Sequence, residues 1–196
     1  MAIVIKSCST DGTIPKYICD PCGKTEGGRV RGAAYFHKSL KGEMTKENLE
    51  LKTWWDSKIE AGLIIIVPTT RGTFDGGSKV TVPGFGDNKE KTKGKNFVSV
   101  VNDENHAANE TFYNALENNF KDYIFGFRTE SELRVATEVM TGFEAKDAVE
   151  EDTESVILWQ ANVAWYQNAP NTTVPIYELT DDVKEYFTNC IEIDED

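Results

Sequence analysis

Four cysteines are the residues of this chain with the greatest capacity for chemistry. Cys19 and Cys22 form a Cys-Asp-Pro-Cys motif, while Cys8 and Cys190 lie far from it in the sequence. Two thiolates at this spacing suit one half of a tetrahedral zinc site, but a structural site needs four ligands. Three interpretations stay open: a proline turn that contains two cysteines, a zinc site of Cys8, Cys19 and Cys22 that Cys190 or His37 could complete, or a redox pair. We expect the turn, with reduced thiols and no cofactor.

Other catalytic patterns are missing from the sequence. The chain has two histidines, His37 and His106, and no Gly-x-Ser-x-Gly nucleophile motif accompanies either of them. The glycine-rich segments near Gly72 and Gly84 lack the lysine and hydroxyl residue of a phosphate-binding loop. The acidic runs lack apolar neighbours that would bury a carboxyl group and raise its pKa. We therefore predict a protein that is not an enzyme and has no catalytic residue.

The overall composition is that of a globular, acidic protein. Of its 196 residues 39% are hydrophobic and 28% charged, and the net charge is −12. Such a surface repels phosphate groups, so we expect no specific binding of DNA, while DNA that passes the surface without binding is not excluded. The longest apolar run, Leu63 to Val67, is far too short to span a membrane, and we expect no membrane contact. The N-terminus lacks a signal peptide, which predicts synthesis in the cytoplasm.

Charge is distributed unevenly along the chain. Residues 78–96 carry a net charge of +3, residues 144–154 carry −5, and residues 178–196 carry −7. Basic and acidic segments of one chain can pair between copies, and simple solvation of charged loops is the alternative. If copies pair, the inter-subunit contact residues are predicted to be Lys89, Lys91, Lys93 and Lys95.

Hydrophobic periodicity predicts a mainly β chain of the α+β type. We expect helices at 45–61, 104–120 and 181–187, and strands at 30–36, 63–67, 79–82, 95–101, 123–128, 133–143 and 156–166. The clearest strand is 156–166, because Trp159, Ala161, Val163 and Trp165 alternate with mostly polar residues. Its apolar face is expected to pack on the 104–120 helix through Phe112 and Leu116.

The predicted elements define one domain with two extensions. Residues 1–28 are expected to form an irregular arm, 29–180 a single β-rich domain, and 181–196 an acidic C-terminal tail. Glycine-rich turns and a lysine-rich loop predict a long exposed β-hairpin, or flap, over 72–96. The 45–61 helix is expected to bury one apolar stripe, composed of Leu51, Trp54, Trp55 and Ile59.

Several short motifs together resemble a family of virion structural proteins from tailed phages of Bacteroidota, including crAss-like phages. The resemblance covers residues 19–166 and consists mainly of turn and framework residues. Its motifs are Cys19-Asp-Pro-Cys22, Glu26-Gly-Gly-Arg-Val-Arg, Gly72-Thr-Phe-Asp-Gly-Gly, Pro83-Gly-Phe-Gly-Asp, Asn109 with Phe112-Tyr-Asn-Ala-Leu, and Phe125-Gly-Phe-Arg-Thr-Glu.

The order of elements is also similar to the tail-tube fold, a β-sandwich or barrel with a flanking helix and a loop that reaches neighbouring subunits. The resemblance implies a homo-oligomeric ring of the tail or head–tail connector, made in the host cytoplasm and located in the virion. Such a ring contacts adjacent tail or neck proteins and builds the DNA ejection channel. The 45–61 helix is an addition to the minimal fold. The alternatives are another virion component, such as a head decoration protein, and a small zinc- or thiol-dependent enzyme.

Overall fold

The computed structural model describes residues 28–68, 70–84, 86, 90–103, 108–148, 158–168 and 173–188. Strands dominate this part of the chain and every pair of them is antiparallel, which confirms the predicted mainly β class. The strands are β1 (Gly32–His37), β2 (Ile64–Val67), β3 (Arg71–Phe74), β4 (Ser78–Pro83), β5 (Glu90–Asp103), β6 (Tyr123–Arg128), β7 (Glu132–Ala148), β8 (Leu158–Asn168) and β9 (Ile176–Glu178).

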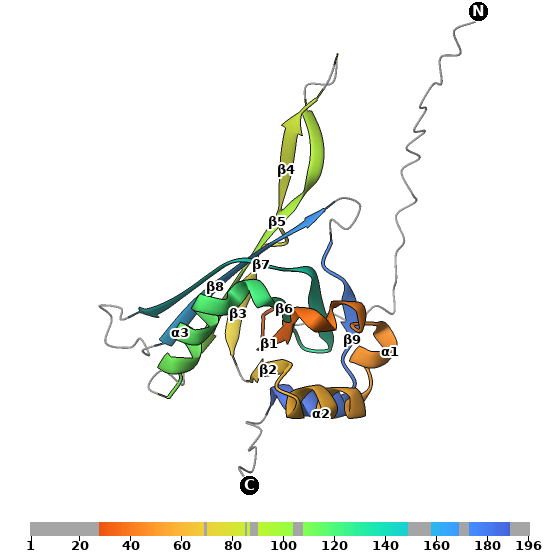
Figure 1. The fold of residues 1–196 in the computed structure, drawn as a ribbon, viewed down its shortest axis with the longest axis vertical. Coiled ribbons are helices and arrows are strands. Elements are labelled where there is room, and N and C mark those ends of the chain that lie inside the picture. The colour runs from red at the N-terminus through yellow and green to blue at the C-terminus, as the bar shows by residue number, and fades with distance from the viewer. Residues whose placement is uncertain are drawn as a thin grey trace, which may run out of the picture.

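The strands form one nine-stranded sheet that curls around its own core (Figure 1). The order is β2-β1-β6-β7-β8-β5-β3, with β4 added to β5 and β9 added to β7. The first half of β7 pairs with β6 and β9, whereas its second half pairs with β8, and register shifts accompany this change of partner. Just before β1, the backbone N–H of Val30 donates to the carbonyl of Gly72 in β3 at 3.2 Å.

Aromatic side chains fill the concave face of the curled sheet. Phe74 on β3 contacts Phe127 on β6, with ring centroids 5.1 Å apart, although the two strands are distant in the strand order. Phe125 on β6 contacts Trp165 on β8 at 5.5 Å. Aromatic rings bury large apolar areas and favour such tilted or offset pairs. The interior therefore holds the two halves of the sheet together.

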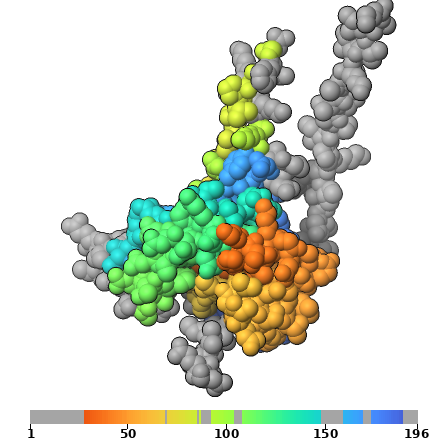
Figure 2. Space-filling view, viewed as in Figure 1, coloured from red at the N-terminus to blue at the C-terminus, as the bar shows by residue number. Residues whose placement is uncertain are grey.

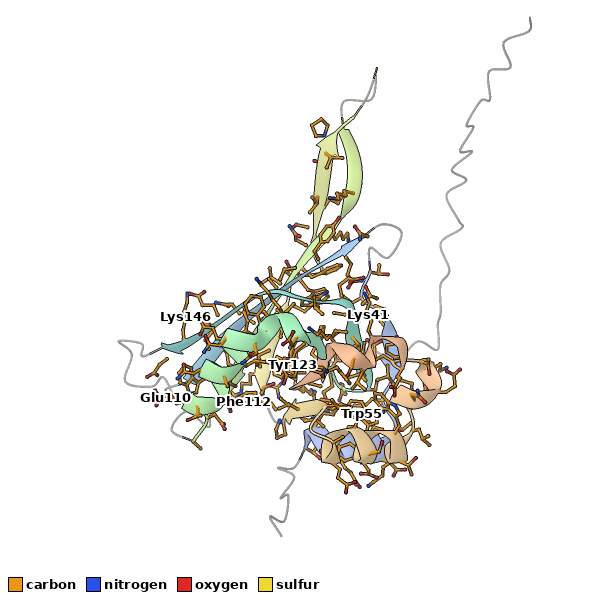
Figure 3. All side chains as sticks on the ribbon, viewed as in Figure 1. Lys41, Trp55, Glu110, Phe112, Tyr123 and Lys146 are labelled. Carbon is orange, nitrogen blue, oxygen red and sulfur yellow. The ribbon has the colours of Figure 1, made fainter. Side chains whose placement is uncertain are left out.

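A layer of short helices covers the opposite face of β1 and β6. Phe36 of β1 contacts Trp55 of α2, which is labelled in Figure 3, and Trp55 in turn contacts Phe187. At Gly32, a Cβ atom would lie 2.8 Å from the Phe187 ring, so this close approach requires glycine. The helical segments of this layer are η1 (Lys38–Gly42), α1 (Lys46–Leu49), α2 (Lys52–Glu60), α4 (Asp181–Lys184) and η3 (Glu185–Phe187).

The helix α3 (Glu110–Asn119) lies within the predicted 104–120 range, but its packing differs from the prediction. Trp159 stacks on Tyr113 of α3 at 5.2 Å, whereas Phe112 contacts Tyr35 of β1. Trp165 lies farther along β8 and packs on Phe74, Phe97 and Phe125 instead. The helix crosses only one end of β8 and therefore cannot reach the whole apolar face.

Two further expectations are corrected by the observed packing. The predicted 45–61 helix divides at Leu51, whose extended backbone precedes α2 and whose side chain is 50% exposed. Trp54 and Trp55 are buried as expected. The predicted acidic tail begins later than 181, because Val183 and Phe187 are both buried in the core. Residues 189–196 lie outside the described residues.

Candidate assembly interface

A rigid turn begins the segment predicted as the flap. The Asp75 carboxylate accepts hydrogen bonds from the backbone N–H of Gly77 at 2.9 Å and of Val98 at 3.0 Å. Gly76 and Gly77 have φ values of 74° and 82°, a region that side chains with a Cβ atom rarely adopt. A Cβ atom on Gly77 would also lie 2.5 Å from the Phe97 ring. These contacts fix the base of the hairpin against the aromatic core.

From this base the β4–β5 hairpin extends away from the body as a narrow arm (Figures 1 and 2). Residues 94–96 of β5 also pair with β8, so the arm is two-stranded only beyond them. β4 pairs with residues 90–96 of β5, and the register shifts between Val80 and Thr81. Most described side chains along the arm are exposed or partly exposed. The arm therefore presents strand surface and backbone edges beyond the core of its own chain.

The predicted contact lysines are distributed along the β5 side of this arm. Lys93 is exposed and Lys95 is partly exposed, and the structure assigns no ion pair to either within the described ranges. Lys79 of β4 is the cross-strand partner of Lys95, so two positive charges share one face of the hairpin. The backbone of Lys91 belongs to β5, whereas Lys89 lies outside the described residues.

Acidic side chains occupy the body instead. Asp181 and Asp182 are exposed in the first turn of α4, and Glu185 lies 3.6 Å from Lys52 of α2. On β7, the exposed Glu144 lies 3.2 Å from Lys146. The remaining acidic positions of 149–154 and 189–196 lie outside the described residues. The arm and the body thus carry charge of opposite sign.

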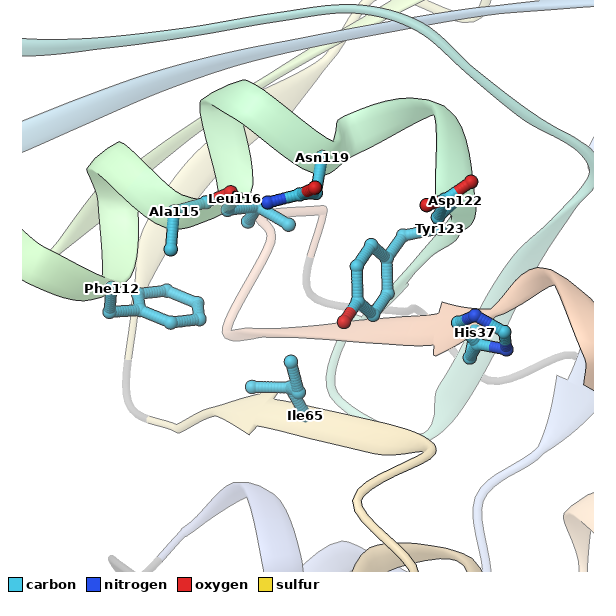
Figure 4. A pocket seen from close by; sticks show the side chains of 8 residues that line it. All are labelled: His37, Ile65, Phe112, Ala115, Leu116, Asn119, Asp122 and Tyr123. Atoms are coloured by element: carbon cyan, nitrogen blue, oxygen red, sulfur yellow. Dashed lines mark hydrogen bonds between the residues drawn. The ribbon is translucent and has the colours of Figure 1, made fainter.

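His37 lies beside a shallow cavity of about 200 Å³ between α3 and the β1–β2 pair (Figure 4). Its Nδ1 accepts a hydrogen bond from the backbone N–H of Ser39, and its ring contacts Tyr123. Asp122 lies at the same end of the cavity as His37, and its carboxylate accepts a hydrogen bond from Lys38 at 2.6 Å, which lowers the pKa of Asp122. The other lining residues are mostly apolar, namely Ile65, Phe112, Ala115, Leu116 and Asn119. The Ser39 hydroxyl lies 2.9 Å from His37 Nδ1, and Ser39 does not line the cavity.

The predicted metal ligands Cys8, Cys19 and Cys22, together with Cys190 and His106, lie outside the described residues. Within the described part of the chain no group of three His, Cys, Asp or Glu side chains could hold a metal ion.

A buried polar cluster near the N-terminal end of α3 escaped prediction. The Tyr113 hydroxyl donates to the Asp103 carboxylate at 2.9 Å, and the Asn109 amide donates to the same oxygen at 3.1 Å. Burial raises the pKa of Tyr113, and the neighbouring Tyr35 and Asp103 raise it further. Tyr35 is also fully buried, and its hydroxyl lacks a hydrogen-bond partner in the described structure. Because Asp103 joins β5 to α3, the cluster positions the helix on the core.

Comparison of the chain with known protein families, curated proteins and solved structures finds no match. Among the described residues, the helices are all too short or too polar to cross a membrane.

Proposed function

We propose that this chain is a virion structural protein of a tailed phage that forms a homo-oligomeric ring of the tail or head–tail connector. The observation that carries the proposal is the β4–β5 hairpin, which extends beyond the body with lysines that form no ion pair in the described structure. Proteins normally cover exposed strand edges or use them for pairing with another chain. A neighbouring subunit is the natural partner for such an arm.

The curled sheet supports a tail-tube-like sandwich or barrel. The Val30–Gly72 bridge links the edge strand β3 to the segment that precedes β1, the second strand from the other end of the order, so the sheet partly closes on itself. α3 lies on the flank as the single helix of that fold, and the hairpin takes the place of the long loop. The helical layer formed by α1, α2 and α4 is an addition to the minimal tail-tube fold.

Head-to-tail contacts between identical copies close into a ring when the rotation between them permits. In such a ring the basic arm reaches the acidic body of the adjacent copy, and the remaining acidic side chains give the channel a net negative wall. A negative wall repels DNA phosphates and lets the duplex pass during ejection. The ring would contact adjacent tail or neck proteins in the virion.

A head decoration protein is the second candidate, because an exposed arm also suits attachment to a capsid surface. The two functions differ in self-association: the ring protein binds its own copies, whereas the decoration protein binds a different chain. A zinc- or thiol-dependent enzyme stays the third candidate, and activity lost on substitution of Cys22 would support it.

The experiment that tests the proposal is a charge reversal on the arm. The variant K89E/K91E/K93E/K95E is compared with K46E/K52E/K121E/K146E, which changes the net charge equally on the body. Sedimentation velocity at increasing concentration measures assembly. We expect the body variant to assemble like the parent chain and the arm variant to stay monomeric. Equal assembly of both variants would show that the arm is not the connecting element.

A further inference from the structure

An arginine is buried where the sheet meets the helical layer. Arg128, the last residue of β6, is the cross-strand partner of Gly32 in β1 and is only 6% exposed. A Cβ atom on Gly32 would lie 2.8 Å from the Phe187 ring and 3.4 Å from the Cγ atom of Arg128. The arginine stem and the phenylalanine ring therefore approach the same point, beside the end of η3.

The guanidinium of Arg128 has few acceptors within the described part of the chain. Its Nη1 lies 3.5 Å from the carbonyl oxygen of Thr129, and its Nε is buried without a hydrogen-bond partner there. A buried polar group without a partner costs free energy, and a buried charge without an opposite charge costs more. The described residues thus leave much of the positive charge of Arg128 uncompensated.

A second arginine adds positive charge at the same place. The backbone N–H of Arg31 donates to the carbonyl of Arg128 at 2.9 Å, and Nε of Arg31 is also buried without a partner among the described residues. Glu130 is the one carboxylate that the described ion pairs assign to these arginines, and it lies 3.7 Å from Nη2 of Arg31, beyond hydrogen-bonding distance. Burial and the charge of Arg31 both lower the pKa of Arg128. The pair is thus suited to an anion.

A source of anionic groups begins next to this pair. Phe187 is the last buried residue of η3, Thr188 is exposed, and residues 189–196 follow. This acidic segment contains no lysine or arginine, and its carboxylates belong to Glu192, Asp194, Glu195 and Asp196. An extended chain spans roughly 3.3 Å per residue, so the first of these carboxylates can reach about 16 Å from Phe187. The arginine stem beside the Phe187 ring lies well within that reach.

We infer that Arg31 and Arg128 form an anion site for a carboxylate, which the acidic segment 189–196 of the same chain supplies. A carboxylate accepts paired hydrogen bonds from a guanidinium group, and such charge-assisted bonds are among the strongest in proteins. The contact holds the acidic segment against the core beside the helical layer. This inference concerns a single chain and does not depend on the proposed ring.

A double-mutant cycle tests the pairing. The variant E192Q/D194N/E195Q/D196N removes the charge of the segment, and Arg128→Met removes the guanidinium while it retains an unbranched stem. The matched control is E150Q/E151Q/D152N/E154Q, which neutralises an equal number of carboxylates in another acidic run. The melting temperature of each variant is measured at low ionic strength, at a concentration where sedimentation velocity shows a monomer.

The cycle has a definite expected result. The segment variant should melt about 3 °C or more below the parent chain, because it leaves a buried guanidinium without a carboxylate. In the Arg128→Met background, the same substitutions should lower the melting temperature by about 1 °C or less. The control should leave the melting temperature unchanged or raise it, since a chain with a net charge of −12 repels itself.

Three results would overturn the inference. An equal loss with and without Arg128 would show that the segment stabilises the chain without pairing with this arginine. A segment variant that melts like the control would show that its carboxylates are not bound. A loss that appears only at concentrations where the chain assembles would show that a neighbouring copy supplies the carboxylate. If Arg128→Met does not fold, the cycle is repeated with Arg31→Met, and the same outcomes decide.

Discussion

The indole ring of Trp165 stacks on the ring of Phe97, with centroids 5.4 Å apart and planes inclined by 13°. The two residues are cross-strand partners on β8 and β5, and Phe74 of β3 stacks on both of them. Phe97 also contacts the turn glycine Gly77, so this stack joins the base of the arm to the centre of the core. Any movement of the arm relative to the core must therefore disturb the packing of these rings.

Replacement of Phe97 by alanine is expected to destabilise the chain strongly. Phe97 is buried, and truncating a buried phenylalanine costs about 3–5 kcal/mol through lost burial and the cavity left behind. The adjacent Val98→Ala is the control and should change the free energy of unfolding by about 0.5 kcal/mol or less, as for surface sites. Urea denaturation measures both. Equal effects would show that the assignment of inner and outer faces on β5 is wrong.

Two buried tyrosines should respond differently to loss of the hydroxyl. Tyr113→Phe removes the donor to the buried Asp103 carboxylate, which we expect to cost about 1–3 kcal/mol. Tyr35→Phe removes a buried hydroxyl that has no partner in the described structure, so the change should be neutral or stabilising. Chemical denaturation of the two variants provides the comparison. If Tyr35→Phe lowered the free energy of unfolding more than Tyr113→Phe, Tyr35 and not Tyr113 would be the donor to the Asp103 carboxylate.

Alkaline pH should destabilise the fold through ionisation of Tyr35 and Tyr113. Burial raises the pKa of both Tyr35 and Tyr113 in the folded state, whereas the unfolded chain releases these protons near pH 10. The unfolded state therefore binds fewer protons above pH 10, and the free energy of unfolding must fall there as pH rises. The double variant Tyr35→Phe/Tyr113→Phe should show a shallower decline between pH 9 and about pH 11. Parallel pH profiles for parent and variant would refute this explanation.

The four cysteines are expected to be reduced and free of metal. Mass spectrometry after alkylation without reductant should find four modified thiols per chain, and a chelator should leave the melting temperature unchanged. Elemental analysis with about one zinc per chain would instead support the site at Cys8, Cys19 and Cys22.

Strong local patterns allowed much of the sheet to be predicted. The alternation along β8 identified its buried face correctly, because Trp159, Ala161, Val163 and Trp165 are all buried. The glycines after Asp75 likewise marked a turn, since their positive φ values suit few other residues.

Features that depend on distant contacts escaped prediction. Leu51 fits a helical apolar stripe, yet the chain divides there, and Trp55 donates its indole N–H to the carbonyl of Leu49. The bond between Tyr113 and Asp103 joins a helix to a strand end, and neither residue carries a motif. β1 is buried on both faces. A helical layer covers one of them, although the sequence of one strand alone would leave one face in contact with solvent.

The central proposal, a closed homo-oligomeric ring with an acidic channel, is tested most directly by electron microscopy of the concentrated protein. We expect end-on class averages of closed rings with a central opening, in which the arm of each copy reaches the next. The resolved channel surface should carry net negative charge. Particles that stay monomeric at every concentration, or rings whose channel wall is basic, would contradict the proposal.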